Sequence, residues 1–548
     1  MKSLKFSSIL VVLMWVMLDL APSTIAAPAN RQEADLFTDA VIEGTIDKLG
    51  DPTVVRARFV DVKFDLLLKA DQLPKDKAAT ADKLVLNLFQ DVVLTALLDR
   101  VESNSPDSFS WIGHLEGVEN SQVILVVGNG LMAGNITLPG AFYQVRYAGN
   151  GIHAVYKIDQ SGFPPEAEPI PVDIPDGDED DGEVMGDDGS IIDVLVVYTA
   201  TARTAAGGTA AMNILIDLAV SETNTSYSNS GIDQRLSLVY REEVNYSEVG
   251  FNWSQTLSRL KNPSDGYMDN VHALRNTYCG DTVVLLVANT SFCGLAYMMS
   301  PVSPSFESWA FALVSYTCAT GYYSFGHELG HNMAARHDWY VDPVNNSPFT
   351  YNHGYVYTPD RWRTVMAYNT ACGDLGFNCT RLQYWSNPEV TYGGVPMGVP
   401  EGSYHAADNR KTLNNTAYTV ANFRESFVKF EPDIKANGSD GPITITTSDP
   451  LSLTVALDAG GSSSENADWW AVGDTPYGWY YYNLLSGWLP GLAVTYQGAL
   501  FDLSPYEVMN MTLPLGFYTF YFGVDMNMNG SIDMGQMYYD SVDITVTP

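Results

Sequence analysis

Three histidines and a glutamate are concentrated between His327 and Asp338, in the stretch HELGHNMAARHD. On a helix, residues four apart share a face, so His327 and His331 can direct two imidazole nitrogens at one metal ion about 2.0–2.1 Å away. His337 follows six residues later, where a continuous helix would turn it to the wrong side. The spacing therefore predicts a helix that stops near Ala334, followed by a turn that brings the third imidazole back.

Three neutral nitrogen ligands predict a zinc ion (Zn2+) whose fourth position is open to water. The metal would lower the pKa of that water to about 7 and make it a nucleophile. Glu328 flanks the first ligand, where it can take the proton of the water and later pass it to a leaving amine. The pattern predicts a metal-dependent hydrolase with Glu328 as its catalytic base.

Two other interpretations account for some of these residues. The histidines could be ordinary polar residues of an amphipathic helix, but a third histidine followed by Asp338 is a poor match to that explanation. The metal site could also be structural, in an exported surface-binding or adhesion protein.

The motif resembles the signature of the metzincin zinc peptidases, and Thr364 to Tyr368 (TVMAY) resembles their Met-turn. The resemblance covers about residues 191–425 and is closest to reprolysin-like enzymes and to the secreted bacterial peptidyl-Asp metalloendopeptidases. It implies a zinc metalloendopeptidase acting on protein or peptide substrates. It also implies that residues 294–299 form an edge strand that aligns substrate by adding it as another strand, although an ordinary sheet strand fits the same residues.

The resemblance assigns roles to three further residues. Met366 would form an apolar floor beneath the ligands, and Asp338 would anchor the turn below them without binding zinc. Tyr368 matches a tyrosine found near the metal in some metzincins, where its phenol could donate to the developing oxyanion; a buried structural tyrosine is the alternative. Ala334 departs from the family, which has glycine there, and a left-handed conformation would cost about 1–2 kcal/mol.

Apolar runs and helical spacing between residues 191 and 430 predict the α/β sheet that must position this motif. The expected strands are residues 191–198, 236–240, 282–287, 294–299 and 311–316, and the expected helices are residues 210–221, 324–336 and 409–423.

The chain is expected to be multidomain because its 548 residues exceed what one core usually serves. Changes in composition predict a signal peptide (1–29), a β-rich propeptide (30–162), an exposed acidic linker (163–190), the α/β metzincin-like catalytic domain (191–430) and an all-β, immunoglobulin-like sandwich (431–548). The propeptide contains no cysteine, so inhibition by a thiolate on zinc is excluded, whereas a carboxylate or a folding role is not. The Asp-rich linker suggests self-cleavage next to Asp, and a plain acidic spacer is the alternative.

The net charge of −35 argues against nucleic-acid binding, and no stretch after the signal peptide is long and apolar enough to span a membrane. We therefore expect a secreted, extracellular protein. The five cysteines favour disulfides in an oxidising compartment. Cys372 with Cys379 would close a short loop and Cys293 with Cys318 could bridge strands, but the spacing leaves the connectivity open.

Two features of the tail suggest binding. Asp525, Asn527, Asn529 and Asp533 follow the first part of a calcium (Ca2+) loop, although Gln536 stands where the loop needs glutamate and a hairpin turn explains the same residues. An aromatic cluster from Trp469 to Trp488 could contact a polymer or another surface, but sandwich cores often absorb such residues.

Overall fold

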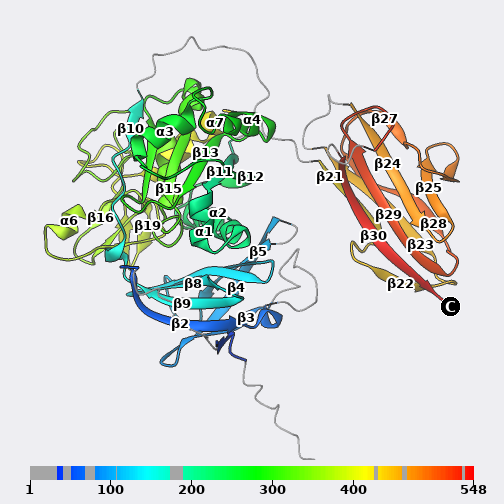
Figure 1. Cartoon of the computed structure of the whole chain (residues 1–548), viewed down its shortest axis with the longest axis horizontal. Helices are drawn as coiled ribbons and strands as arrows, with labels where there is room; N and C mark the ends of the chain where they lie inside the picture. Colours follow the sequence, from blue (N-terminus) through cyan, green and yellow to red (C-terminus); the bar gives the residue numbers. More distant parts are fainter. Residues whose placement is uncertain are drawn as a thin grey trace, which may run out of the picture. The chain divides into compact units, whose positions relative to one another are not determined.

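The computed structural model describes residues 34–40, 51–67, 81–105, 108–172, 189–424, 430–459, 466–532 and 537–548 (Figure 1). The predicted signal peptide and the Asp-rich centre of the predicted linker lie outside the described residues. The chain divides into one compact unit that ends at Ile158 and a second that begins at Asp159.

The first unit contains a nine-stranded antiparallel sheet in the order β1-β2-β9-β8-β7-β6-β5-β4-β3. Asn129 and Gly130 both have positive φ, which is the geometry of the tight turn that joins β6 to β7. Apolar residues on these strands, including the fully buried Trp111 and Leu125, form a core of their own. The strands are β1 (Phe37–Asp39), β2 (Val54–Val62), β3 (Lys83–Phe89), β4 (Val92–Ser105), β5 (Ser108–Leu115), β6 (Gln122–Gly128), β7 (Leu131–Leu138), β8 (Ala141–Gly149) and β9 (Ile152–Ile158).

A six-stranded sheet in the order β10-β14-β15-β13-β11-β12 forms the centre of the predicted catalytic region. Its strands are β10 (Ile170–Val172), β11 (Ile191–Thr199), β12 (Arg235–Val244), β13 (Thr282–Val287), β14 (Gly294–Met299) and β15 (Phe311–Ser315). The neighbouring strands run parallel, except that β14 is antiparallel to β15. Strands β13, β14 and β15 are buried throughout, as expected for a sheet covered on both faces.

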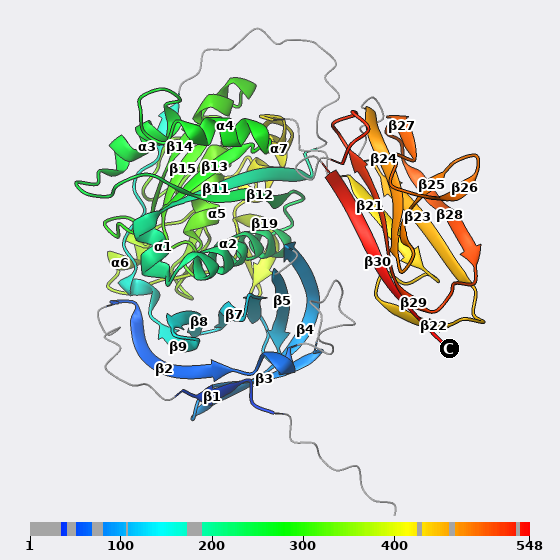
Figure 2. The same cartoon turned by 45° about the vertical axis from the view of Figure 1, so that its right-hand side comes forward.

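Helices cover both faces of this sheet, with α3, α4 and α7 on one face and α1, α2 and α5 on the other (Figure 2). They are α1 (Ala200–Ala206), α2 (Thr209–Asn229), α3 (Trp253–Lys261), α4 (Asn270–Thr277), α5 (Ser324–Asn332) and α7 (Asn409–Ala421), with the short α6 (Thr370–Gly373) in a loop. Helix α5 packs on β14 and β15, so the predicted metal motif rests directly on the sheet. Among the described residues no single helix is long and apolar enough to cross a membrane, although α1 and α2, bent by 90°, meet those criteria together.

The start of the predicted linker differs from the exposed segment that its composition suggested. Phe163 is buried and stacks on Tyr322, and β10 pairs in parallel with β14. Apolar contacts and backbone hydrogen bonds therefore hold this segment against the catalytic region. The Pro and Asp content of the segment could not predict this packing, because composition does not indicate which surface a segment packs against.

The tail contains only strands among its described residues, in two sheets around a separate core. One sheet has the order β21-β23-β28, and the other has the order β22-β30-β29-β24-β25-β26 with β27 beside β24. Trp469 and Trp470 are buried, whereas Trp479 is exposed, so only part of the aromatic cluster is available for the predicted surface contact. The strands are β21 (Glu431–Ala436), β22 (Ile443–Thr446), β23 (Leu451–Asp458), β24 (Asn466–Thr475), β25 (Gly478–Asn483), β26 (Gly487–Pro490), β27 (Tyr496–Ala499), β28 (Leu503–Met511), β29 (Gly516–Asp525) and β30 (Met537–Thr547).

Candidate active site

Helix α5 carries His327, Glu328 and His331, and every one of its residues is buried. Two glycines let it approach its neighbours closely. A Cβ on Gly330 would lie 2.7 Å from the ring of Trp385 and 3.0 Å from Sδ of Met366, and one on Gly294 of β14 would collide with the Glu328 side chain. Close packing thus fixes the helix between β14 and the Met366 turn.

The helix ends as the histidine spacing requires. The amide of Ala334 donates to the carbonyl of His331 and the amide of Ala335 donates to that of Gly330, which is the paired bonding of a Schellman cap. Ala334 has φ of 69°. It therefore adopts the left-handed conformation at the position where the family pattern has glycine. The expected helix was four residues too long, because the cap reverses the chain after Asn332.

The three imidazoles converge on one point. Nε2 of His337 lies 3.1 Å from Nε2 of His331 and 3.3 Å from Nε2 of His327. Ligand atoms about 3.3 Å apart are what a tetrahedral zinc ion with bonds of about 2.0–2.1 Å requires. Among the described residues, the three histidines form one group of side chains close enough to share a metal ion.

Contacts at their other nitrogen orient two of the rings. Nδ1 of His331 lies 2.8 Å from the carbonyl of Ala335, so its Nδ1–H donates and leaves Nε2 as the ligand atom. Nδ1 of His327 lies 2.9 Å from the carbonyl of Val365 and also contacts Nη2 of Arg381, and these two neighbours hold the ring with Nε2 towards the other histidines. Nδ1 of His337 faces the Glu168 carboxylate at 3.5 Å, which is longer than a hydrogen bond. Burial lowers the pKa of all three rings, that of His337 to about 3, and keeps them neutral as metal ligands must be.

Glu328 is fully buried beside the ligands, and neither of its carboxylate oxygens has a hydrogen-bond partner. Burial raises the pKa of Glu328 well above its usual value, and the nearby Glu166 carboxylate raises it further. The Arg381 guanidinium pairs with Glu166, which leaves the buried Glu328 carboxylate as the one without a partner beside three neutral imidazoles. The donor set and this charge deficit both fit a divalent zinc ion held by the three histidines.

Asp338 and Met366 both lie close to the three histidines. One Asp338 oxygen accepts from the amide of Tyr368 at 2.8 Å and the other from that of Tyr340 at 3.1 Å, so this carboxylate joins the loop after the third ligand to the Met366 turn. Met366 is buried beneath α5. The Tyr368 ring lies 4.1 Å from that of His337, and its hydroxyl donates to the carbonyls of Glu166 and Ala167 at 3.2 Å each.

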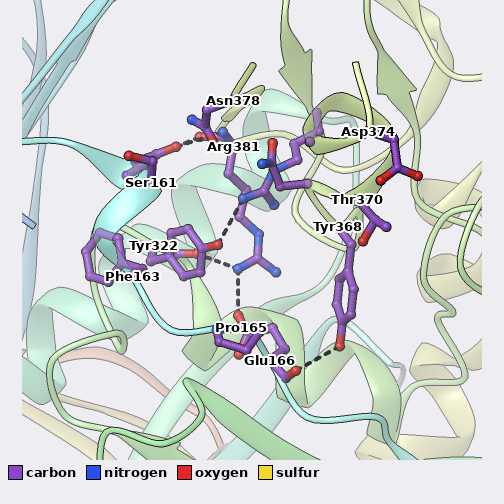
Figure 3. Close-up of a pocket in the computed structure, with 14 residues that line it drawn as sticks. Ser161, Phe163, Pro165, Glu166, Tyr322, Tyr368, Thr370, Asp374, Asn378 and Arg381 are labelled. Atoms are coloured by element: carbon purple, nitrogen blue, oxygen red, sulfur yellow. Dashed lines mark hydrogen bonds and ion pairs between the residues drawn. The ribbon is translucent and has the colours of Figure 1, made fainter. Parts of the chain in front are cut away.

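Glu166 and Arg381 also belong to the site, and sequence reasoning missed both. Arg381 is buried between Tyr322 and the His327 ring, and its Nη1 donates to Glu166 Oε1 at 2.6 Å (Figure 3). Glu166 is in turn close enough to His327 and Glu328 to share a metal ion with them. No local motif distinguishes these residues, because their roles depend on contacts across more than two hundred positions.

The structure contains the two disulfides that the cysteine spacing suggested, Cys293–Cys318 and Cys372–Cys379. The first ties the start of β14 to the turn before α5, and the second closes the loop after the Met366 turn. In the tail, the amide of Asn527 donates to Asp525 and the amide of Ser531 donates to Asn529, as in an ordinary turn. Asp533 lies outside the described residues, and the calcium loop stays a prediction.

Comparisons with known proteins agree with this geometry. The model of metallo-peptidase family M12 matches residues 188–386. A peptidyl-Asp metalloendopeptidase of Stenotrophomonas maltophilia is 41% identical over 376 residues, covering 64% of this chain and 85% of the relative. The chain belongs to the peptidyl-Asp metalloendopeptidase family. A peptidyl-Asp metalloendopeptidase of Xanthomonas campestris is 38% identical, over 64% of this chain and 85% of the relative. One of Pseudomonas fragi is 34% identical, over 37% of this chain and all of the relative.

Membership of this family makes the chain a metalloendopeptidase that acts on protein or peptide substrates. It favours the hydrolase over the alternative of a binding or adhesion protein with a structural metal. An M12 peptidase requires a metal, usually zinc, and His327, His331 and His337 provide a group to hold it.

Proposed function

We propose that this chain is an exported, zinc-dependent endopeptidase in which Glu328 is the general base, with a preference for cleavage next to Asp. The observation that carries the proposal is the convergence of the three Nε2 atoms beside the buried, unpartnered carboxylate of Glu328. The name of the relatives supports the substrate preference. The two disulfides support export, because disulfides persist in oxidising compartments.

His327, His331 and His337 would hold the zinc, which when bound supplies a Lewis acid that acidifies water and polarises the peptide carbonyl. Glu328 takes one proton from the attacking water and gives it to the amide nitrogen as the C–N bond breaks. The Tyr368 hydroxyl donates to the carbonyls of Glu166 and Ala167. Once the segment that carries these carbonyls has left, the hydroxyl can donate a hydrogen bond to the developing oxyanion.

Substituting the base tests this role. Glu328→Gln should lower kcat/KM for a peptide substrate by about 100- to 10,000-fold, because an amide cannot take the proton. Zinc content, measured by mass spectrometry of the purified protein, should stay at one ion per chain. Glu389→Gln, which removes an exposed carboxylate, is the matched control and should keep full activity. Hydrolysis by the Glu328→Gln variant at the control rate would refute the assignment.

We also propose that the chain is made as a latent precursor, with residues 1–29 as a signal peptide and residues 30–172 as a propeptide whose last segment covers the catalytic site. The amide of Cys293 donates to the carbonyl of Pro165, the amide of Ala167 donates to that of Gly294, and β10 continues this pairing along β14. The segment thus occupies the edge of β14, where a peptide substrate would pair as an added strand. The hydroxyl of Tyr368 is occupied by the same segment.

A synthetic peptide of residues 159–172 should inhibit the secreted enzyme competitively, because it can re-form these bonds. A peptide of the same composition in scrambled order is the control. N-terminal sequencing of the secreted product should find a start within residues 173–192, beyond the covering segment. Equal inhibition by both peptides, or an active product that still carries residues 159–172, would refute latency.

A further inference from the structure

Arg381 is a buried cation next to the catalytic residues. It is 1% exposed, its Nε donates to the carbonyl of Val365 at 2.7 Å, and its Nη2 lies beside the ring of His327. A buried guanidinium costs several kcal/mol unless a negative partner faces it. Among the described residues Arg381 forms one ion pair, with Glu166.

That carboxylate comes from the covering segment and not from the catalytic region itself. Glu166 is 6% exposed; Oε1 receives bonds from Arg381 Nη1 at 2.6 Å and Ser324 Oγ at 2.7 Å, while Oε2 has no hydrogen-bond partner. When the segment leaves, Arg381 loses its ion-pair partner and Ser324 loses this acceptor. What remains is a site with a fixed cation and a hydroxyl donor, which fits another carboxylate.

A cavity of about 350 Å³ opens at this point, and Figure 3 shows Arg381 in its wall with Glu166 below it and Tyr368 next to Glu166. Arg363 also lines it, but its guanidinium is already engaged by the Cys379 and Ala367 carbonyls and the Tyr322 hydroxyl. Asp374, the other acidic residue in the lining, is exposed and accepts from the hydroxyl of Tyr340. Arg381 also donates to the Val365 and Tyr322 carbonyls, but it is the arginine of this lining that pairs with a carboxylate of the covering segment, and it loses that partner when the segment leaves.

We propose that Arg381 is the specificity-determining residue of this enzyme, which selects an acidic side chain next to the scissile bond, and that Glu166 takes the place of that side chain in the precursor. The inference rests on the proposed function and deepens it by naming the residue that reads the substrate. An arginine suits this task because its planar guanidinium presents paired N–H groups in the geometry that a carboxylate accepts. Its position beside His327 brings the selected side chain close to the reacting carbonyl.

Matched peptides that differ at one position, Asp, Asn or Ala, test the proposal with the enzyme secreted from the full-length chain. The unsubstituted enzyme should cleave next to Asp at least 30-fold better than next to the isosteric Asn. Arg381→Met should lower the ratio of kcat/KM for the Asp peptide to that for the Asn peptide by at least about 30-fold, because the charge pair is lost with the Asp peptide alone. Retained Asp preference, or an equal loss on all three peptides, would overturn the proposal.

Arg363→Met is the control for the second arginine of the cavity. It should leave the ratio of Asp to Asn cleavage unchanged even if it lowers stability, and a collapse of the ratio here instead of in Arg381→Met would assign the role to Arg363. If the enzyme cleaves none of the peptides, the proposed function fails; if it cleaves all three equally, only the role of Arg381 fails.

A binding measurement covers the case in which Arg381→Met does not fold. The labelled 159–172 peptide and its Glu166→Gln form are titrated into the Glu328→Gln enzyme and followed by fluorescence anisotropy. The loss of the carboxylate should weaken binding at least 30-fold. Equal affinity of the two peptides would overturn the inference without any measurement of cleavage.

Discussion

Ala334 shows how one residue bears the strain of the metal site. Its φ of 69° is needed to reverse the chain between His331 and His337. The left-handed region costs a residue with a Cβ about 1–2 kcal/mol, which is small beside the order of 10 kcal/mol that structural zinc binding provides. The strain is therefore compatible with a complete ligand set.

Ala334→Gly should raise the free energy of unfolding by about 0.5–1 kcal/mol, because the relief of strain exceeds the extra entropy of glycine in the unfolded chain. Thermal unfolding with zinc present measures the change. Ala335→Gly is the matched control: its φ is not positive, so it should destabilise by about 0.5–1 kcal/mol. A lower melting temperature for Ala334→Gly would contradict this account.

At the scale of elements, α5 is placed by contact and not by its own propensity. It is nine residues long, two of its residues are glycines, and it begins after Tyr323 in a left-handed conformation. Such a helix is unstable alone. Its position comes from β14, β15 and the Met366 turn, which is why the metal site depends on packing around Gly330.

Gly330→Ala should destabilise the protein by about 1–3 kcal/mol, because the added methyl group would meet Trp385 and Met366, both fully buried. The displaced helix should also release zinc more readily to a chelator, as measured by the rate of metal transfer. Met366→Leu, which conserves volume in the same contact, should cost less than about 1.5 kcal/mol. Zinc release at the original rate from Gly330→Ala would count against packing as the determinant of the site.

At the scale of the whole molecule, separate hydrophobic cores lie in the first unit, the catalytic region and the tail. Because the cores are separate, a change of pH can destabilise one part of the chain without the others. In the first unit His153 is fully buried and accepts a bond from the amide of Met132 at 3.0 Å, so burial lowers its pKa to about 4.

Because the folded pKa of His153 lies below the unfolded value of about 6.5, its contribution is present above pH 6.5 and is lost as the pH falls towards 4. We expect the first unit to lose on the order of 3 kcal/mol of stability over that window. Hydrogen exchange of residues 122–158 at pH 7 and at pH 4 measures the loss. His153→Gln keeps an acceptor but does not titrate, so its exchange should depend less on pH; an unchanged dependence would show that other groups dominate.

Much of the catalytic region was predictable from the chain itself. The spacing of His327, His331 and His337 predicted that the three rings converge and that the chain turns between the second and the third, because helical periodicity is a local property. Strands β13 and β14 were predicted with their observed bounds, since continuous apolar runs between turn signals leave little choice of structure. The two disulfides join the cysteine pairs that the sequence suggested, although the spacing alone left the connectivity open.

The tertiary structure alone decided what surrounds the metal ligands. Glu166 is 215 residues from Arg381, yet the two form a buried ion pair, and a segment whose composition resembles a linker pairs with β14. Neither contact has a periodic or compositional signal, because each depends on how distant surfaces meet and not on the conformation of a few neighbouring residues. The spacing of three histidines and a glutamate predicts the metal chemistry because it is a local property, and the fold decided which side chains stand beside them.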